Sequence, residues 1–269
     1  MANVVLGTWN VSECVNACWD VNTGIDSNPS FDVLMNNCDE IIKLINENGI
    51  DVICFQEFPT VVEDSEEITQ KIIQNTKLKY HYSVDTYPTF LVKNGRAGVA
   101  IFSSTELISK KFSFMENPDI RKLSKNGKVY YSFDKGLITA DLLIEGQPLT
   151  VVTGHAFSFS PFGALAEDYP SAFKEISNCA FDALTKNENV VVVGDFNTEK
   201  LFEILPELND DFKDNLSGPT TVSGVMEGEN FKSGRKLDYF LTAPSVRVGK
   251  TTKIKNFSDH CLCICECSF

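Results

Sequence analysis

Short runs of apolar, often β-branched residues recur along the whole chain, and several of them are bounded by turn residues. Runs of this length and composition are typical of β-strands. Because each strand must bury at least one face, a chain dominated by such runs is restricted to architectures that pack sheets. The predicted strands are Val4–Asn10, Ile50–Glu57, Gly98–Ser103, Leu137–Ile144, Leu149–His155, Val190–Asn197, Leu237–Thr242 and Cys261–Cys267.

Helical spacing of apolar residues interrupts the strands in three places. Asn28-Pro29-Ser30 gives a start signal, apolar residues then recur with helical period from Phe31 to Ile45, and Asn48-Gly49 gives a stop. Further helices are predicted from Ser171 to Leu184 and from Glu66 to Asn75. Strands that predominate over a few inserted helices predict an α/β chain in which two sheets pack face to face, with helices outside.

The composition supports a folded chain with a substantial core. Hydrophobic residues make up 43% of the 269 residues, and 20 of them are phenylalanine, which excludes a disordered chain. The sequence shows no repeat, low-complexity tract or Pro/Gly/Ser linker. A single domain over residues 1–269 is therefore expected.

The charge and the cysteines limit the class of protein. A net charge of −13 argues against a protein that coats nucleic acid, since such proteins neutralise many phosphates with Lys and Arg. It does not exclude a nuclease that holds a few phosphates and relies on metal ions. No run of residues approaches the length of a membrane span. The nine cysteines lack the density of a disulfide scaffold, which favours a cytoplasmic protein.

Polar residues occupy the strand ends in a pattern that predicts a site. Four predicted strands finish in such residues, and two late segments open with them. In antiparallel pairing the carboxyl end of one strand lies beside the amino end of its neighbour, so one rim could collect all of them. The residues expected to converge are Asn10, Glu57, His155, Asp195, Asn197, Asp238, Asp259 and His260.

Each of these residues also has a simple structural explanation. Asp195-Phe196-Asn197 after a strand is often only a turn, because Asp and Asn bond their own backbone. A single Glu57 after a strand is usually solvated, and a single His is more often structural than catalytic. The case for a site depends on the coincidence of every cluster with the same rim.

At these residues the chain resembles the endonuclease/exonuclease/phosphatase superfamily, which includes deoxyribonuclease I, abasic-site endonucleases, neutral sphingomyelinases and inositol polyphosphate 5-phosphatases. The resemblance implies a deoxyribonuclease I-like four-layer α/β/β/α sandwich and a Mg²⁺- or Mn²⁺-dependent hydrolase. The segments that carry it occur in the order typical of the family: Thr8-Trp9-Asn10, Phe55-Gln56-Glu57, Gly98–Ser103, Thr153-Gly154-His155, Val193–Asn197, Leu237-Asp238-Tyr239 and Ser258-Asp259-His260.

The resemblance also implies roles for individual residues. Glu57 resembles the principal metal ligand, with Asn10 beside it and Asp259 on the same or a second metal. Asp195 would orient or deprotonate the attacking water, and Asn197 would bind phosphate. His155 and His260 would contact the phosphate, with Asp238 orienting His260. The Thr153-Gly154-His155 segment departs from the abasic-site branch, which has a Tyr-containing motif there.

These residue types suit attack on phosphorus. A metal held by oxygen ligands cancels negative charge at the phosphate, and Mg²⁺ prefers such ligands. Either Asp195 or His260 could be the base, and either one or two metals could bind. Arg96 and Lys135 could reach substrate phosphates, although solvated basic residues are the simpler explanation.

Two other patterns have structural explanations. Cys261, Cys263, Cys265 and Cys267 share one strand face and are expected to pack in the core. The basic residues of the segment 121–128 surround Asn126-Gly127, which predicts a surface hairpin.

Three functions remain open at this level. A nuclease acting on DNA or RNA is the first, and it should show a basic strip beside the rim. A small-molecule or lipid phosphatase or phosphodiesterase is the second, and a lipid enzyme should show an exposed apolar loop there. A non-catalytic binding module of the same fold is the third, and it would be expected to lack some rim residues, whereas none is missing.

Overall fold

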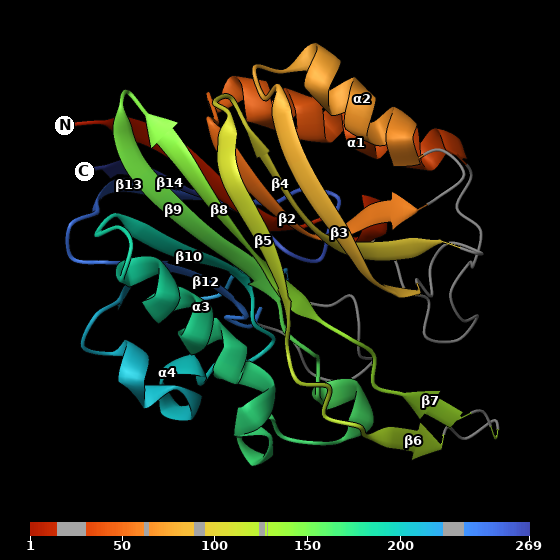
Figure 1. The fold of residues 1–269 in the computed structure, drawn as a ribbon. Helices are drawn as coiled ribbons and strands as arrows, with labels where there is room; N and C mark the ends of the chain where they lie inside the picture. The colour runs from red at the N-terminus through yellow and green to blue at the C-terminus, as the bar shows by residue number, and fades with distance from the viewer. Residues whose placement is uncertain (15–30, 62–64, 89–94, 124–126, 128, 223–233) are drawn as a thin grey trace.

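The computed structural model describes residues 1–14, 31–61, 65–88, 95–123, 127, 129–222 and 234–269. Two six-stranded sheets form the centre, and helices cover their outer faces (Figure 1). The predicted α/β/β/α sandwich is therefore confirmed. Among the described helices, none is long and apolar enough to cross a membrane.

The first sheet has the strand order β13-β14-β1-β2-β4-β3. Its central pair, β1 and β2, is parallel, whereas its other pairs are antiparallel. The strands are β1 (Asn3–Asn10), β2 (Val52–Val61), β3 (Tyr80–Pro88), β4 (Arg96–Ser103), β13 (Arg247–Ile254) and β14 (Leu262–Ser268).

The second sheet has the order β11-β12-β10-β9-β8-β5, again with one parallel pair, β9 and β10. Its strands are β5 (Leu107–Phe114), β8 (Gly136–Ile144), β9 (Gln147–His155), β10 (Val190–Asp195), β11 (Lys213–Asp214) and β12 (Asp238–Thr242). A separate hairpin joins β6 (Arg121–Leu123) to β7 (Val129–Tyr131), which confirms the predicted surface hairpin; Lys125, Asn126 and Lys128 lie outside the described residues.

The helices are α1 (Phe31–Glu47), α2 (Ser65–Asn75), α3 (Lys174–Leu184) and α4 (Leu201–Ile204). Short 3-10 turns occupy Ser12–Cys14, Ser160–Phe162, Ala166–Asp168, Pro170–Phe173 and Pro206–Leu208. The predicted stop at Gly49 is confirmed by its φ of 59°, while the start signal at 28–30 lies outside the described residues. The helix predicted from Ser171 begins as a 3-10 turn and becomes α-helical at Lys174.

Three layers of apolar side chains hold the sandwich together. Alternate residues of β10 show the pattern, because Val191 and Val193 pack between the sheets while Val190 and Val192 face the α3 side. The row Cys261, Cys263, Cys265 and Cys267 is buried in the layer between the sheets, as predicted. The first sheet buries its other face under α1 and α2 (Figure 1).

Candidate active site

The first sheet delivers Asn10 at the end of β1, immediately before a tight turn. Ser12, Glu13 and Cys14 all have left-handed backbone angles, with φ of 44°, 57° and 59°. Such angles are unfavourable for residues with a Cβ, so the surrounding structure must hold them. The Ser12 amide donates to Asn10 Oδ1 at 3.0 Å, which leaves the Asn10 amide nitrogen pointing into the site.

Glu57 reaches the site through a bulge and not through a strand end. The strand β2 continues to Val61, and its register with β4 shifts between Gln56 and Phe58, so Glu57 has no partner on β4. Its φ of 51° is left-handed. Bulges re-aim side chains in this way next to functional sites. The prediction that this strand stops at Glu57 was therefore wrong, because a pattern of apolar residues does not reveal a bulge.

The second sheet places three site residues side by side by register alone. Asp195 on β10 lies opposite His155 on the parallel neighbour β9 and opposite Asp238 on the antiparallel neighbour β12. Glycines precede Asp195 and His155 because the two backbones approach closely: a Cβ on Gly194, whose φ is 149°, would lie 2.0 Å from the Gly154 carbonyl oxygen.

The loop before β14 completes the cluster. The Ser258 hydroxyl donates to the Asn10 carbonyl at 2.7 Å and accepts from the His260 amide at 3.1 Å. Ser12 bonds both Ser258 and the carboxylate of Asp259. These bonds tie the end of β1 to the approach to β14 and fix the position of His260.

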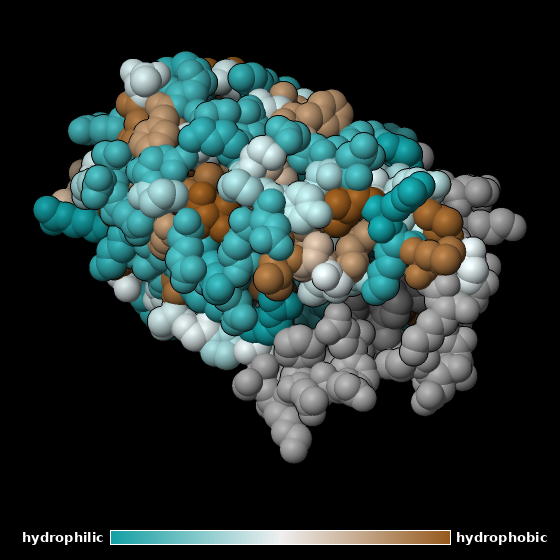
Figure 2. All heavy atoms as spheres, turned by 90° about the horizontal axis from the view of Figure 1, so that it is seen from below, coloured by the Kyte–Doolittle hydropathy of each residue, from teal (hydrophilic) through white to brown (hydrophobic). Residues whose placement is uncertain are grey.

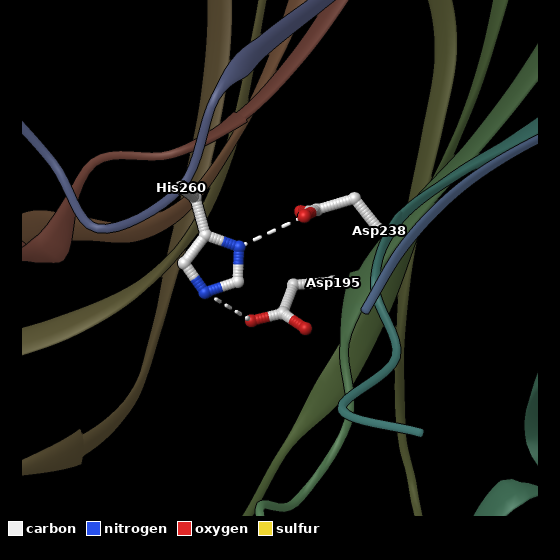
Figure 3. A group of neighbouring side chains, drawn as sticks. All are labelled: Asp195, Asp238 and His260. Atoms are coloured by element: carbon white, nitrogen blue, oxygen red, sulfur yellow. Dashed lines mark hydrogen bonds and ion pairs between the residues drawn. The ribbon is translucent and has the colours of Figure 1, made fainter. Parts of the chain in front are cut away.

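Asp195 and Asp238 hold the His260 ring between them (Figure 3). His260 Nδ1 lies 2.9 Å from Asp238 Oδ2, and Nε2 lies 3.5 Å from Asp195 Oδ2. Asp195 Oδ2 also accepts from Asn10 Nδ2 at 3.0 Å, which joins the two sheets through one carboxylate. All three side chains in Figure 3 are buried, and their ligand atoms lie within 4.8 Å of one another, so the group could hold a divalent cation.

Opposite shifts of pKa distinguish the two histidines. Burial lowers the pKa of His260, but Asp238, Asp195 and Asp259 outweigh it and raise that pKa well above its ordinary value. Burial, Lys135 and His260 hold the pKa of His155 well below its ordinary value. His260 is therefore a cation at neutral pH, and His155 is neutral.

The carboxylates have raised pKa values for a related reason. Burial and, to a lesser extent, Asp238 raise the pKa of Asp195 to about 7, against the opposing effect of the His260 cation. Burial raises the pKa of Glu57 as well; Lys135 opposes the shift and Asp259 adds to it. A buried carboxylate in this situation favours a bound cation, because a cation stabilises its ionised form.

His155 and Asn197 occupy the other side of Asp195. His155 Nε2 lies 3.6 Å from Asp195 Oδ2 and 3.7 Å from Glu57 Oε1. Asn197, whose φ is 52°, donates from its backbone to Asp195 Oδ1 at 2.9 Å and from Nδ2 to the Ala156 carbonyl at 3.0 Å. Asn197 Nδ2 also lies 3.1 Å from His155 Nε2.

The Lys135 ammonium lies behind His155 in an aromatic enclosure. Its Nζ is 2.8 Å from His155 Nδ1 and 3.3 Å from Nε2, so it lies over the ring and contacts both nitrogens. It is also 4.1 Å from the centre of the Tyr87 ring and 4.9 Å from that of Phe133. Burial lowers the pKa of Lys135 to about 8, although Glu57, Asp195 and Glu13 favour its charged form.

The structure brings together most of the residues predicted for the site. Arg96 is the exception: it pairs with Asp85 near the start of β4, and no described contact joins it to the cluster. The residues in or beside the cluster are Asn10, Glu57, Lys135, His155, Asp195, Asn197, Asp238, Asp259 and His260.

Three neighbours of the cluster were not predicted. Ser12 and Glu13 are buried in the left-handed turn after Asn10, and Tyr87 is the second-last residue of β3, a strand the sequence did not indicate. Proximity to Asn10 in the sequence was the only signal for the first two. Tyr87 had none, because its strand is polar and half-exposed.

The comparisons with known proteins agree with this architecture. The sequence model of the endonuclease/exonuclease/phosphatase family matches residues 7–260. No curated protein matches the chain. An endonuclease/exonuclease/phosphatase family protein from Leptotrichia buccalis superposes with a TM-score of 0.67 at 19% identity, covering 99% of this chain and all of that one.

Two further solved structures share the fold. The human nocturnin catalytic domain with bound sulfate gives a TM-score of 0.68 at 17% identity, covering 99% of this chain and 94% of that one. A mannosyl-6-phosphatase from Bacteroides thetaiotaomicron gives 0.58 at 13% identity, covering 99% of this chain and all of that one.

Proposed function

The chain belongs to the endonuclease/exonuclease/phosphatase family, and from that premise we propose that it is a hydrolase that breaks phosphoester bonds with the help of Mg²⁺ or Mn²⁺. One observation carries the proposal. Asp195 Oδ2 is held by Asn10 from the first sheet and faces a His260 cation that is itself paired with Asp238. Activation of water at a phosphate requires a carboxylate, a neutral donor and a cation close together.

The donor set near Glu57 fits a hard cation. Glu57 and Asp259 supply carboxylate oxygens, and Asn10 hydrogen-bonds Glu57; the pKa of Glu57, raised by burial, fits a carboxylate that a cation would stabilise. The Asp195, Asp238 and His260 group is a second candidate, but its atoms already bond one another. We therefore assign the metal to Glu57 and Asp259, with Asn10 beside Glu57. When bound, the cation would neutralise phosphate charge and polarise the P–O bond.

Asp195 is the better candidate for the base. A cationic His260 has no free lone pair to accept a proton, whereas Asp195 with a pKa of about 7 is substantially ionised at neutral pH. In this assignment Asp195 takes a proton from the attacking water. Asp238 holds His260 in its charged form, and His260 stabilises the charge that develops on the phosphoryl oxygens.

Neutral donors surround the same point. The Asn10 and Asn197 amides can hydrogen-bond phosphoryl oxygens without adding negative charge to a site that already holds several carboxylates. The neutral His155 can do the same. Lys135 contributes the remaining positive charge on the inner wall.

The sequence favours nucleic acid as the first substrate class. The described surface instead favours the second class, a lipid or other phosphorylated small molecule. The basic residues just before Asp238 are already paired, Arg235 with Glu199 and Lys236 with Asp214, and Arg96, away from the cluster, pairs with Asp85. A basic strip for a nucleic-acid backbone is therefore not formed by these residues.

The β6–β7 hairpin instead exposes apolar side chains on the segment that leads into Lys135. Leu123 is 69% exposed and Tyr131 62%, and Val129 is opposite Leu123 in the hairpin. In Figure 2 hydrophobic side chains gather at the right edge, where Figure 1 places this hairpin. An exposed apolar hairpin on the segment that leads into Lys135 favours a lipid or other phosphorylated small molecule as substrate.

A substrate panel tests the proposal. The protein is incubated with Mg²⁺ or Mn²⁺ and DNA, RNA, sphingomyelin, inositol phosphates or a chromogenic phosphate ester, with Glu57→Ala, Asp195→Asn and His260→Ala alongside. We expect turnover that EDTA and each substitution abolish while circular dichroism shows an intact fold. Wild-type turnover by purified Asp195→Asn would disprove the assigned mechanism.

A further inference from the structure

Lys135 is a buried cation without a direct carboxylate partner among the described residues, although Glu57, Asp195 and Glu13 favour its charge from farther away. It is 4% exposed, and no described carboxylate oxygen lies within 4.0 Å of its Nζ. A buried ammonium without a paired anion is costly. In an enzyme, a substrate can supply the missing anion.

The hydrogen bonds of the ammonium are also incomplete. An ammonium carries three N–H donors, and the acceptors that contact Lys135 among the described residues are the two nitrogens of one neutral imidazole. A neutral imidazole offers one lone pair. At least two donors are therefore left for another partner, while the Tyr87 and Phe133 rings stabilise the charge without accepting conventional hydrogen bonds.

The site around Lys135 is closed on the side away from the carboxylates. Tyr87 and His155 are each 3% exposed, and Tyr87 stacks on Phe133 with ring centres 4.6 Å apart. A phosphoryl oxygen could reach the ammonium past His155. An alkyl or sugar group attached to that oxygen would meet the Tyr87 and Phe133 rings, whose centres lie 4.1 and 4.9 Å from the ammonium.

The charge of Lys135 and the enclosed space around it favour the same class of substrate. Resting on the proposed function, we infer that Lys135 recognises the additional charged oxygen of a phosphate monoester, so that the enzyme prefers a terminal dianionic phosphoryl group to a phosphodiester. A diester presents an ester group in place of one such oxygen and carries one charge less. Lys135 is thus a specificity residue that contacts substrate.

The test compares two substrates with the same leaving group, p-nitrophenyl phosphate and methyl p-nitrophenyl phosphate, at neutral pH with Mg²⁺. Wild type should have the higher kcat/KM for the monoester. Lys135→Met disturbs His155 for both substrates, but it should lower kcat/KM for the monoester at least about 30-fold more than that for the diester. Lys110→Met is the control, since Lys110 also lies over a tyrosine ring, that of Tyr82, but on an exposed strand.

Several outcomes would overturn the inference. These are a wild-type preference for the diester, an equal loss on both substrates in Lys135→Met, or an unchanged preference in that variant. If Lys135→Met does not fold, Lys135→Gln and Lys135→Arg replace it; Arg should keep part of the monoester preference and Gln should lose it. Equal preferences in those two variants would refute the role of charge.

A binding measurement separates this inference from the proposed function. Inorganic phosphate is titrated calorimetrically into wild type and Lys135→Met, without any substrate to hydrolyse. If the variant binds phosphate more weakly and wild type turns over no ester, the anion site is supported and the proposed hydrolase is rejected. Equal phosphate affinity would reject the anion site, whatever the turnover.

Discussion

His260 Nδ1 lies 2.9 Å from Asp238 Oδ2, and this contact joins the loop before β14 to the first residue of β12. It also determines the charge of the histidine, because Asp238 is the largest of the effects that raise the pKa of His260. The other ring nitrogen faces Asp195, so the imidazole links two carboxylates of the second sheet.

Asp238→Asn should therefore impair catalysis more than folding. Loss of the carboxylate lowers the pKa of His260 and removes the fixed orientation of the ring, so kcat should fall by about 10²- to 10⁴-fold. Steady-state kinetics measures this. Asp141→Asn is a matched control, since Asp141 accepts hydrogen bonds from Ser109 and Thr150 elsewhere in the same sheet. Similar losses in both variants would contradict a specific role for Asp238.

Glu57→Gln should remove the dependence of thermal stability on the metal. Without a cation, the ionised Glu57 is disfavoured by burial and by Asp259, so the metal-free variant should melt at or above the wild-type Tm. Added Mn²⁺ should raise the Tm of wild type but not that of the variant, and calorimetry should show affinity weaker by at least about tenfold. Glu106→Gln, an exposed carboxylate between β4 and β5, should respond like wild type.

Gly194→Ala should destabilise the second sheet. A Cβ at this position would lie 2.0 Å from the Gly154 carbonyl oxygen, which forces β9 and β10 apart. We expect a loss of about 1–3 kcal/mol in the free energy of unfolding, measured with urea. Gly249→Ala is the control because its Cβ would meet only Glu266, at 3.7 Å. An unchanged urea midpoint for Gly194→Ala would show that the strands can adjust.

Lys135 should make stability depend on alkaline pH. Its pKa is about 8 in the folded protein and roughly 10.4 in an unfolded chain. Between these two pKa values the unfolded state binds more protons than the folded state. The free energy of unfolding therefore rises with pH, by up to about 3 kcal/mol, and this gain is lost as the pH falls back through 8. Urea unfolding of wild type and Lys135→Met at pH 7–10.5 should show that wild type gains stability relative to the variant as the pH rises. Parallel curves would mean that the ammonium is not desolvated.

Much of this architecture could be predicted from local sequence patterns. The inner strands β1, β8, β9, β10 and β14 are apolar enough to be recognised, and their polar ends mark the rim. The outer strands β3, β5 and β13 were missed because they expose one face or an edge and carry many polar residues, so alternation is hidden.

The position of Glu57 shows a different limit. Its residue type and order in the chain were sufficient to select it, but the bulge that directs its side chain is a property of the pairing between β2 and β4. The same holds for Lys135. The sequence identifies it only as a basic residue before a strand. Its burial against Tyr87 and Phe133 depends on how the chain folds around it.

The cluster draws Asn10, Glu57 and His260 from the first sheet side and His155, Asp195 and Asp238 from the second. Neither sheet alone contains a complete set of donors and acceptors. During folding, a chain with only one finished sheet would hold half of these groups and could not act on substrate. Recovery of catalysis on refolding is thus a direct measure of the docking of the two sheets, and it should not precede the burial of the cysteine row between them.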